Sequence, residues 1–177
     1  MIKLLWKKSE FMLNFRLYNK LIDIDLDNWH KSDYSIYYNE VNKYALFNES
    51  ISDLYQSYMD ESNQTGSIFD KMIVVEEDEL KVALIVVNYF ISEKDNKKVL
   101  GINPIIINPK YIKSGYGKKI VQYIIECKGR IFDMIPDRIY AGIDITNEVS
   151  LHLFESLGFR QVGKTSDNEF LYYELEL

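Results

Sequence analysis

The chain has a single cysteine, Cys127, among its 177 residues. One thiol cannot form an internal disulfide bond, and it cannot supply the several thiolates of a cysteine-based zinc site. We therefore expect a protein without a metal, suited to a reducing cytoplasm. No histidine is visibly paired with Cys127, so we interpret it as a core residue at the end of a helix and not as a nucleophile.

Long apolar runs are also missing. No segment approaches the roughly 20 apolar residues that a membrane-spanning helix needs. The N-terminal stretch begins with apolar residues, but the polar segment Lys7–Glu10 interrupts it before it reaches signal-peptide length. The sequence therefore predicts a cytoplasmic protein with no membrane partner, and it leaves the order of residues 1–13 open.

Positive charge is in deficit, because the formal net charge is −6 and the isoelectric point is about 5.0. Such a chain lacks the cationic surface that attracts proteins to the phosphates of nucleic acids, so we expect no nucleic acid partner. The same charge favours a cationic partner such as a polyamine, an aminoglycoside or a lysine-rich peptide. Ordinary solubility is the simpler explanation of the same charge.

The composition that remains is that of one soluble globular domain over residues 1–177, with 47% hydrophobic and 27% charged residues. In its first part, the pattern predicts a strand over Phe15–Asp25 and helices over Trp29–Tyr44 and Glu49–Met59. The polar cluster Glu61–Gly66 predicts a loop after the second helix.

The second part predicts an antiparallel meander of three strands, followed by alternating helices and strands. The expected strands are Lys71–Val75, Leu80–Ile91, Val99–Ile107, Arg138–Ile145, Phe159–Gly163 and Phe170–Leu177, and the expected helices are Tyr116–Cys127 and Asn147–Leu157. This order predicts an α/β (α+β) domain, with a mixed, mostly antiparallel seven-stranded sheet flanked by about four helices.

The most informative stretch is IIINPKYIKSGYGKKI, residues 105–120, where an apolar strand leads through a glycine-containing loop into a helix. Glycines let the backbone approach a ligand closely, and the first amides of a helix have no intrahelical acceptor. Lys113, Lys118 and Lys119 add positive charge there, so the stretch predicts a phosphate or pyrophosphate site. It matches neither a Walker A loop nor GxGxxG, so a different phosphate ligand is needed.

The same stretch resembles the GNAT superfamily of N-acetyltransferases. That family has V-x-P at a strand end and then [RQ]-x-x-G-x-[GA] at a helix start, and this chain has Ile107-Asn108-Pro109 and then IKSGYG over residues 112–117. A second family motif, N-x-x-[AS]-x-x-x-[YF]-x-x-x-GF, matches residues 147–159. The resemblance covers roughly residues 99–163, and the first 70 residues follow the family only in the order of their elements.

The resemblance implies a sheet that splays at its central strands and a site for acetyl-CoA. Backbone amides of Lys113–Lys118 would hold the pyrophosphate, and the strand edge Ile105–Ile107 would bind the pantetheine arm. Asn147 would contact the arm from the other side, and Phe154 would lie near the thioester sulfur. The cofactor-binding positions are therefore Ile105, Ile107, Ile112, Lys113, Ser114, Gly115, Tyr116, Gly117, Lys118, Asn147, Ser150 and Phe154.

Two positions depart from the family pattern. Ile112 stands at the [RQ] position, which removes a side-chain contact to the pyrophosphate but no amide contact. Phe154 stands where many members have the tyrosine proposed to protonate the departing thiolate, and phenylalanine has no proton to give. A thiol has a pKa near 8.5, so a thiolate can leave without an obligatory acid.

Direct attack by an amine requires the neutral form, so a base within reach assists the reaction. Asp144 is the first candidate because it flanks the strand beside the cofactor gap, although a solvent-facing or helix-capping carboxylate fits its position equally. Glu93 and Glu77 are weaker candidates because both lie in charged turns. We interpret His30 and His152 as surface residues.

The acceptor is expected to bind residues 26–66, the part that varies most within the family. Aromatic residues that line this site or pack the helices on the sheet are Trp29, Tyr34, Tyr37, Tyr38, Tyr55 and Tyr58. The expected acceptor is a small cationic amine, and the alternatives are a peptide amine or a non-catalytic acyl-CoA-binding module. A homodimer formed by pairing of the strand Phe170–Leu177 would accompany any of these functions.

Overall fold

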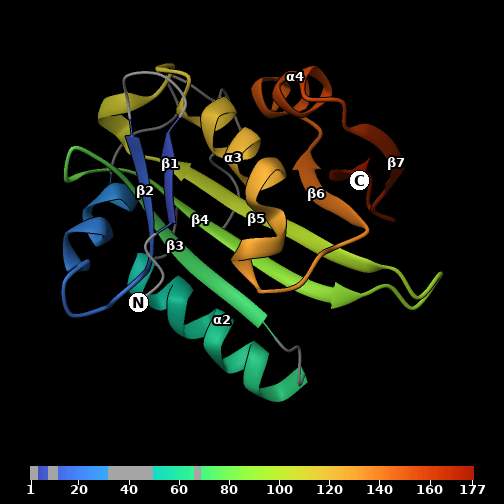
Figure 1. Cartoon of the computed structure of the whole chain (residues 1–177), viewed down its shortest axis with the longest axis horizontal. Helices are drawn as coiled ribbons and strands as arrows, with labels where there is room; N and C mark the ends of the chain where they lie inside the picture. Colours follow the sequence, from blue (N-terminus) through green and yellow to red (C-terminus); the bar gives the residue numbers. More distant parts are fainter. Residues whose placement is uncertain (1–3, 8–11, 32–49, 66–68) are drawn as a thin grey trace.

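The computed structural model describes residues 4–7, 12–31, 50–65 and 69–177. They form an eight-stranded sheet in the order β1-β2-β3-β4-β5-β6-β8-β7 (Figure 1). The strands are β1 (Leu4–Lys7), β2 (Met12–Leu17), β3 (Phe69–Glu77), β4 (Leu80–Ile91), β5 (Lys98–Ile107), β6 (Arg138–Asp144), β7 (Arg160–Lys164) and β8 (Phe170–Glu176). The expected mixed, mostly antiparallel sheet is confirmed, since only β5 and β6 pair in parallel, and β1 adds a strand to those expected.

Helices pack on both faces of this sheet. They are η1 (Ile24–Lys31), α2 (Ile51–Thr65), η4 (Pro109–Tyr111), α3 (Tyr116–Ile131) and α4 (Glu148–Ser156), where η marks a 3-10 helix. Ile120 and Ile124 of α3 and Phe154 of α4 belong to one buried cluster, and Leu26 of η1 and Leu54 of α2 belong to another. Because both faces of its central part are covered, β4 is buried without interruption from Val82 to Val87.

Two predictions for the first part of the chain are wrong. The strand predicted over Phe15–Asp25 ends at Leu17, because Asn19 turns the chain by accepting from the backbone of Leu21 and η1 begins soon after. The predicted loop over Glu61–Gly66 is helical as far as Thr65, since its polar residues form the last turns of α2. Of the helix predicted over Trp29–Tyr44, the structure describes the part up to Lys31, which belongs to η1.

The sheet opens between β5 and β6. Backbone pairing between them stops at Ile102 and Ala141, while β5 continues to Ile107 in pairing with β4. An irregularity in register between Ile85 and Val87 of β4 accompanies the change of direction of β5. Figure 1 shows the two strands diverging toward their C-terminal ends. The splay expected at the central strands is thus confirmed.

None of the helices in the part of the chain that the structure describes is long and apolar enough to cross a membrane.

Candidate functional site

The loop after β5 is fastened to the sheet by Asn108. Its backbone N–H donates to the carbonyl of Val82 at 2.9 Å, and its side-chain Nδ2 donates to the carbonyl of Lys81 at 2.8 Å. Its Oδ1 accepts from the backbone N–H of Lys110 at 3.0 Å and so caps η4, in which Pro109 occupies the first turn. The backbone N–H and the side-chain Nδ2 of Asn108 therefore hold the loop against β4, while its Oδ1 caps η4.

Gly115 directs the chain from this loop into α3. Its φ of 82° is left-handed, which favours glycine, and Lys113 before it also has a positive φ of 64°. No side chain of the described residues caps α3 at Gly115, and the first amides of a helix lack intrahelical acceptors. The N–H groups of Tyr116, Gly117 and Lys118 thus lie at the positive end of the helix dipole, beside the exposed residues Lys113 and Ser114. This donor set fits a pyrophosphate.

Glu77 lies at the start of α3, where it accepts a hydrogen bond from the hydroxyl of Tyr116. Lys119 approaches the same carboxylate to 3.9 Å and lies over the Tyr116 ring at 5.0 Å from its centroid. Burial and the bond to Glu77 raise the pKa of Tyr116 well above its ordinary value, so this hydroxyl stays protonated. Glu77 thus anchors the start of α3 beside the loop of residues 108–115 that joins β5 to α3 (the phosphate loop).

The edge of β5 that faces the opening is defined by the direction of its amides. Since the N–H of Asn108 donates to β4, alternation along the strand turns the N–H and C=O groups of Ile105 and Ile107 toward the β6 side. The apolar side chains beside this edge are half-buried and belong to Ile105, Ile107, Leu151, Leu153 and Leu157. An extended ligand laid along β5 would meet backbone donors and acceptors together with apolar surface.

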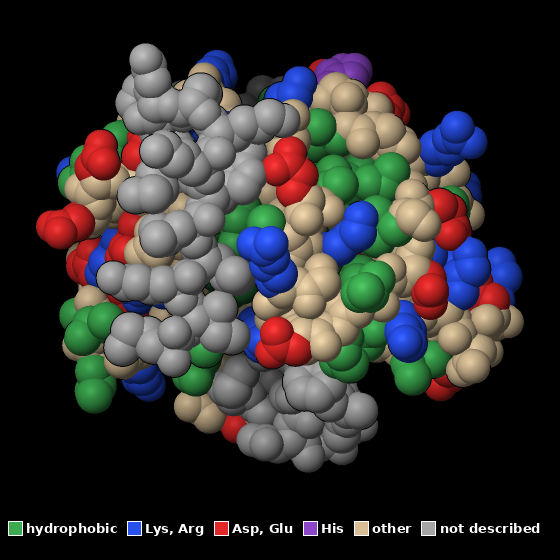
Figure 2. All heavy atoms as spheres, viewed as in Figure 1, with side chains coloured by type: hydrophobic (Ala, Val, Ile, Leu, Met, Phe, Trp, Pro, Cys, Tyr) green, Lys and Arg blue, Asp and Glu red, His purple; other side chains and the backbone are tan. Residues whose placement is uncertain are grey.

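The face that carries α3 shows basic and acidic side chains mixed together, with hydrophobic side chains gathered beside α3 and below α4 (Figure 2). The gathered hydrophobic side chains lie over the region where β5 and β6 separate. A surface of this composition suits the apolar part of a ligand whose anionic end lies at the loop that carries Lys113.

The second sequence motif places Asn147 and Ser150 at the start of α4. The Oδ1 of Asn147 accepts from the backbone N–H of Ser150 at 3.1 Å, so these two motif positions form the helix cap. The cap uses the Oδ1 of Asn147 and not its side-chain N–H₂. Phe154, in the same helix, is 5% exposed and packs edge-on against Phe159 at 4.9 Å between ring centroids.

Asp144 ends β6, three residues beyond the last pair of β6 with β5, and is 6% exposed. Its Oδ1 accepts from both the backbone N–H and the hydroxyl of Thr146, each at 2.7 Å. Its Oδ2 is buried, and no donor among the described residues reaches it. One oxygen therefore fixes the carboxylate, and the other is left to accept a proton or a hydrogen bond.

The remaining candidates lie elsewhere. Glu93 is in the turn between β4 and β5, about 30 Å along β5 from its C-terminal end. His152 is 81% exposed, as expected of a surface residue, and the side chain of His30 lies outside the described residues. Cys127 is buried, and burial raises the pKa of its thiol, which confirms the core interpretation. Ile112 is half-buried in the loop.

Part of the expected acceptor segment packs as core. Trp29 is buried in the cluster under α2 and η1, and Tyr55 packs against Tyr18 at 4.9 Å between ring centroids. The other candidates there lie outside the described residues or have side chains outside them: Tyr34, Tyr37, Tyr38 and Tyr58.

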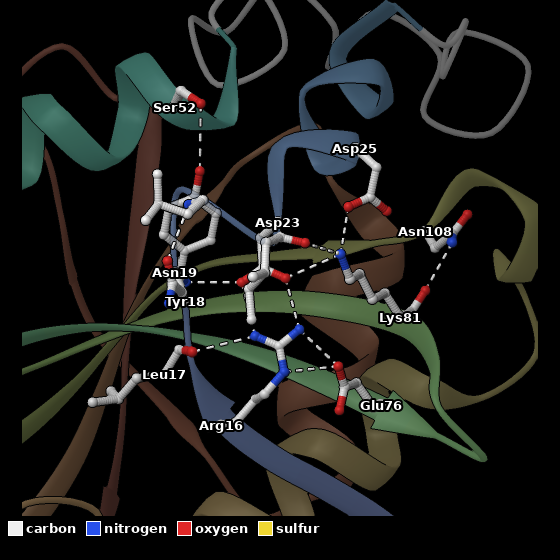
Figure 3. Close-up of polar contacts among 12 residues, drawn as sticks. Arg16, Leu17, Tyr18, Asn19, Asp23, Asp25, Ser52, Glu76, Lys81 and Asn108 are labelled. Carbon is white, nitrogen blue, oxygen red and sulfur yellow. Dashed lines mark hydrogen bonds and ion pairs between the residues drawn. The ribbon is translucent and has the colours of Figure 1, made fainter. Parts of the chain in front are cut away.

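An ion-pair network that the sequence analysis missed lies beside the loop (Figure 3). Asp23 is fully buried and accepts from both terminal nitrogens of Arg16, at 2.7 and 2.6 Å. Arg16 also bonds Glu76 at 2.8 Å, and Lys81 lies 3.0 Å from Asp23 and pairs with Asp25. No spacing in the sequence signals this network, because its members come from separate elements.

Burial alone would raise the pKa of Asp23, but hydrogen bonds from Arg16, the Asn19 backbone and Lys81 outweigh it and hold that pKa at about 2. Hydrogen bonds to Asp23 and Glu76 raise the pKa of Arg16 against the opposing effect of burial. Asp23 is therefore ionised whenever the protein is folded near neutral pH, and it fixes η1 to β2 and β4.

No group of three or more metal-ligating side chains is found within residues 4–7, 12–31, 50–65 and 69–177.

Solved structures of similar fold include an uncharacterized protein from Bacillus halodurans, with a TM-score of 0.71 and 18% identity over 98% of this chain and 90% of that one. A spermidine N-acetyltransferase from Vibrio cholerae, in complex with CoA and spermine, has a TM-score of 0.61 and 19% identity over 93% and 95%. The ribosomal-protein-S18-alanine N-acetyltransferase from Escherichia coli has a TM-score of 0.59 and 12% identity over 93% and 94%.

A search of curated proteins gives no match to the chain. The model of the acetyltransferase (GNAT) family matches residues 24–159, which include the phosphate loop, the open edge of β5 and the start of α4. The chain belongs to the GNAT acetyltransferase family and is an acyl-CoA-dependent N-acetyltransferase.

Proposed function

We propose that the protein transfers the acetyl group of acetyl-CoA to a primary amine of a small cationic molecule, by direct attack in a ternary complex. The observation that carries this proposal is the separation of β5 from β6 after Ile102 and Ala141, beside a helix start that no described side chain caps. Together they offer an extended polar edge that ends at an anion site.

The residues that would hold acetyl-CoA follow from these features. The amides of Lys113 and Gly115–Lys118 would bind the pyrophosphate, since the amide of Ser114 already donates to the carbonyl of Tyr111 at 3.2 Å. The edge Ile105–Ile107 would bind the pantetheine arm as an added strand. Asn147, with Ser150 as its capping partner, would donate to the arm from α4. Ile112 contributes its backbone only.

Acetyl-CoA supplies a thioester, whose carbonyl carbon accepts the amine nitrogen. The C–N bond forms, the C–S bond breaks, and the proton lost by the amine neutralises the departing sulfur through the solvent or a base. An N–H of the β5 edge polarises the carbonyl, and holding both reactants together supplies about 7–11 kcal/mol of the barrier.

Asp144 is the base we propose, since its Oδ2 is buried without a donor among the described residues. Phe154 carries no proton, so the sulfur leaves as a thiolate or takes its proton from water. Its buried ring closes the apolar side of the site through contact with Phe159.

The net charge of −6 favours a cationic acceptor over an anionic one. The spermidine N-acetyltransferase of similar fold was solved with the cationic amine spermine, and this supports the same class here. A peptide amine is the second class to test, because the acetyltransferase that acts on a ribosomal protein also shares the fold.

The test is thiol release from acetyl-CoA, detected with a thiol reagent, across polyamines, aminoglycosides, amino acids and basic peptides. We expect thiol release with polyamines or aminoglycosides. Release with basic peptides alone would show that the acceptor is a peptide amine and not a small cationic molecule. A rise in melting temperature with acetyl-CoA but no turnover with any amine would support a non-catalytic binding module.

A further inference from the structure

A cluster of side chains lies on the sheet face opposite α3, at the point where β5 and β6 begin to separate. Its members, the sheet-face cluster, are Asn88 and Phe90 of β4, Gly101 of β5, Tyr140 of β6 and Tyr172 of β8. Gly101 and Tyr140 form the pair next to Ile102 and Ala141, after which pairing between the two strands stops.

The direction of these side chains follows from alternation along β6. Ile139, Ala141 and Ile143 point into the core beneath α3, so Tyr140 points to the opposite face. Phe90 and Tyr172 lie on that face too, because both rings contact Tyr140. Leu26 and Leu54 of the other buried cluster cover Leu84, Val86 and Ile106 farther along the same face.

Three rings line the cluster at close range. The centroid of Tyr140 lies 6.3 Å from that of Phe90, nearly edge-on, and 5.4 Å from that of Tyr172. Tyr172 lies against Gly142, which has no side chain to displace it. Phe90 is 37% exposed, so part of the aromatic surface faces outward. Burial and the nearby Tyr172 raise the pKa of Tyr140, which keeps its hydroxyl neutral.

Asn88 supplies a polar atom among these rings. Its side chain lies directly on Gly101, where a Cβ would come within 1.9 Å of Oδ1, so a larger residue at position 101 would displace the Asn88 amide. The Oδ1 atom is buried, and no donor among the described residues reaches it. An N–H group of a ligand would satisfy this oxygen, which the described residues leave without a donor.

The charged groups around the cluster favour a cation. Arg138, two residues before Tyr140, is already bound to Asp95 at 2.8 Å and to Glu174 at 3.4 Å. Farther along the same face of β6 lies Asp144, whose Oδ2 has no donor among the described residues. Arg138 is therefore neutralised by its own carboxylate partners, so it does not oppose a cation at the cluster.

We propose, on the basis of the function proposed above, that the sheet-face cluster binds a second, protonated nitrogen of the acceptor. The arm that begins at the Lys113–Lys118 loop and follows β5 backward from Ile107 delivers the thioester to the closed end of the opening, where the cluster lies. The aromatic rings attract the ammonium group, and the Asn88 Oδ1 accepts one of its N–H groups. The substrate class is thus a diamine or polyamine, with one charged nitrogen held while another reacts.

The test compares 1,4-diaminobutane with 1-aminobutane, by calorimetric binding to the CoA-saturated protein and by acetyl transfer. We expect the wild type to bind the diamine at least about tenfold more tightly. Tyr172→Leu should weaken diamine binding about fivefold, the equivalent of about 1 kcal/mol for a lost cation–π contact. Tyr172→Phe, the matched control, keeps the ring and should retain the preference, and the affinity for CoA should stay unchanged in both variants.

Asn88→Ala gives an independent measurement if Tyr172→Leu does not fold. It removes a buried oxygen that has no donor in the described structure, so it should weaken diamine binding while the melting temperature stays the same or rises. Equal affinity of the wild type for the two amines would overturn the inference, as would an unchanged preference in Asn88→Ala. In either case, acetyl transfer to both amines would leave the proposed function standing, whereas absence of CoA binding would overturn the proposed function itself.

Discussion

The side-chain amide of Asn108 donates a hydrogen bond to the backbone carbonyl of Lys81 at 2.8 Å. The side chain of Lys81 in turn lies 3.0 Å from the buried Asp23, so the phosphate loop and η1 are fastened to the same residue of β4. Figure 3 shows this line of contacts from Arg16 through Asp23 and Lys81 to Asn108. Contacts with Lys81, which lies outside the sequence motif of residues 107–117, thereby position the phosphate loop.

Asn108→Ala removes both side-chain hydrogen bonds of the loop. At about 1 kcal/mol each, their loss should lower the free energy of unfolding by about 2 kcal/mol and weaken CoA binding about tenfold. Calorimetric titration with CoA measures the affinity. Asn28→Ala is the matched control, because Asn28 is exposed in η1. Unchanged CoA affinity in Asn108→Ala would show that the backbone holds the loop by itself.

Gly115→Ala tests the left-handed turn before α3. The added Cβ meets no atom within 4 Å, so its cost is conformational, about 1–2 kcal/mol for a non-glycine residue at a φ of 82°. We expect a lower melting temperature and weaker CoA binding, because the amides of α3 shift from their places. Gly129→Ala, in the interior of the same helix, should be neutral or stabilising. Equal effects of the two substitutions would contradict this account.

Asp23 makes stability depend on pH. Its pKa is lowered from 3.8 to about 2 in the folded state, so its contribution is fully present above pH 3.8 and is lost as the pH falls toward 2. The shift corresponds to about 2 kcal/mol. Urea unfolding between pH 2 and 6 should show this loss in the wild type.

Asp23→Asn should be less stable at pH 6 by about 3 kcal/mol or more, because Arg16 then lacks its buried partner. Its stability should also fall less steeply than that of the wild type between pH 3.8 and 2. A variant with the same pH dependence as the wild type would assign the acid sensitivity to other carboxylates.

Asp144→Asn tests the proposed base. The amide keeps an oxygen for the two donors of Thr146 but accepts a proton poorly, so kcat should fall about 10²-fold or more while the KM for acetyl-CoA is retained. Glu93→Gln is the control, since Glu93 lies in the turn at the far end of β5. A full kcat in Asp144→Asn would restrict Asp144 to capping the turn after β6.

Several elements follow directly from local pattern. The strand β4 matches its predicted bounds Leu80–Ile91, because a continuous run of β-branched and aromatic residues is bounded by polar turns on both sides. The start of α3 at Tyr116 was also predicted, and the helix predicted from Asn147 begins one residue later, with Asn147 as its cap.

Other elements escaped the same reasoning. The alternation of LIDID resembles a strand, but Asp23 is buried by partners from β2 and β4 that no local window contains. The last turns of α2 are polar, and polarity alone does not end a helix that already packs through Ile51 and Leu54. In both places, tertiary contacts outweigh local preference.

The sequence by itself determined the family and predicted the phosphate loop and the strand edge beside it, because each depends on residues close together in the chain. Only the tertiary structure decided which side chains meet. It brought Asn108 to Lys81, buried Asp23 between Arg16 and Lys81, and gathered Asn88, Phe90, Tyr140 and Tyr172 from three strands onto one face. The physical reason is that charge pairing and ring contacts act over a few ångströms in space, and the sheet sets those distances regardless of separation along the chain.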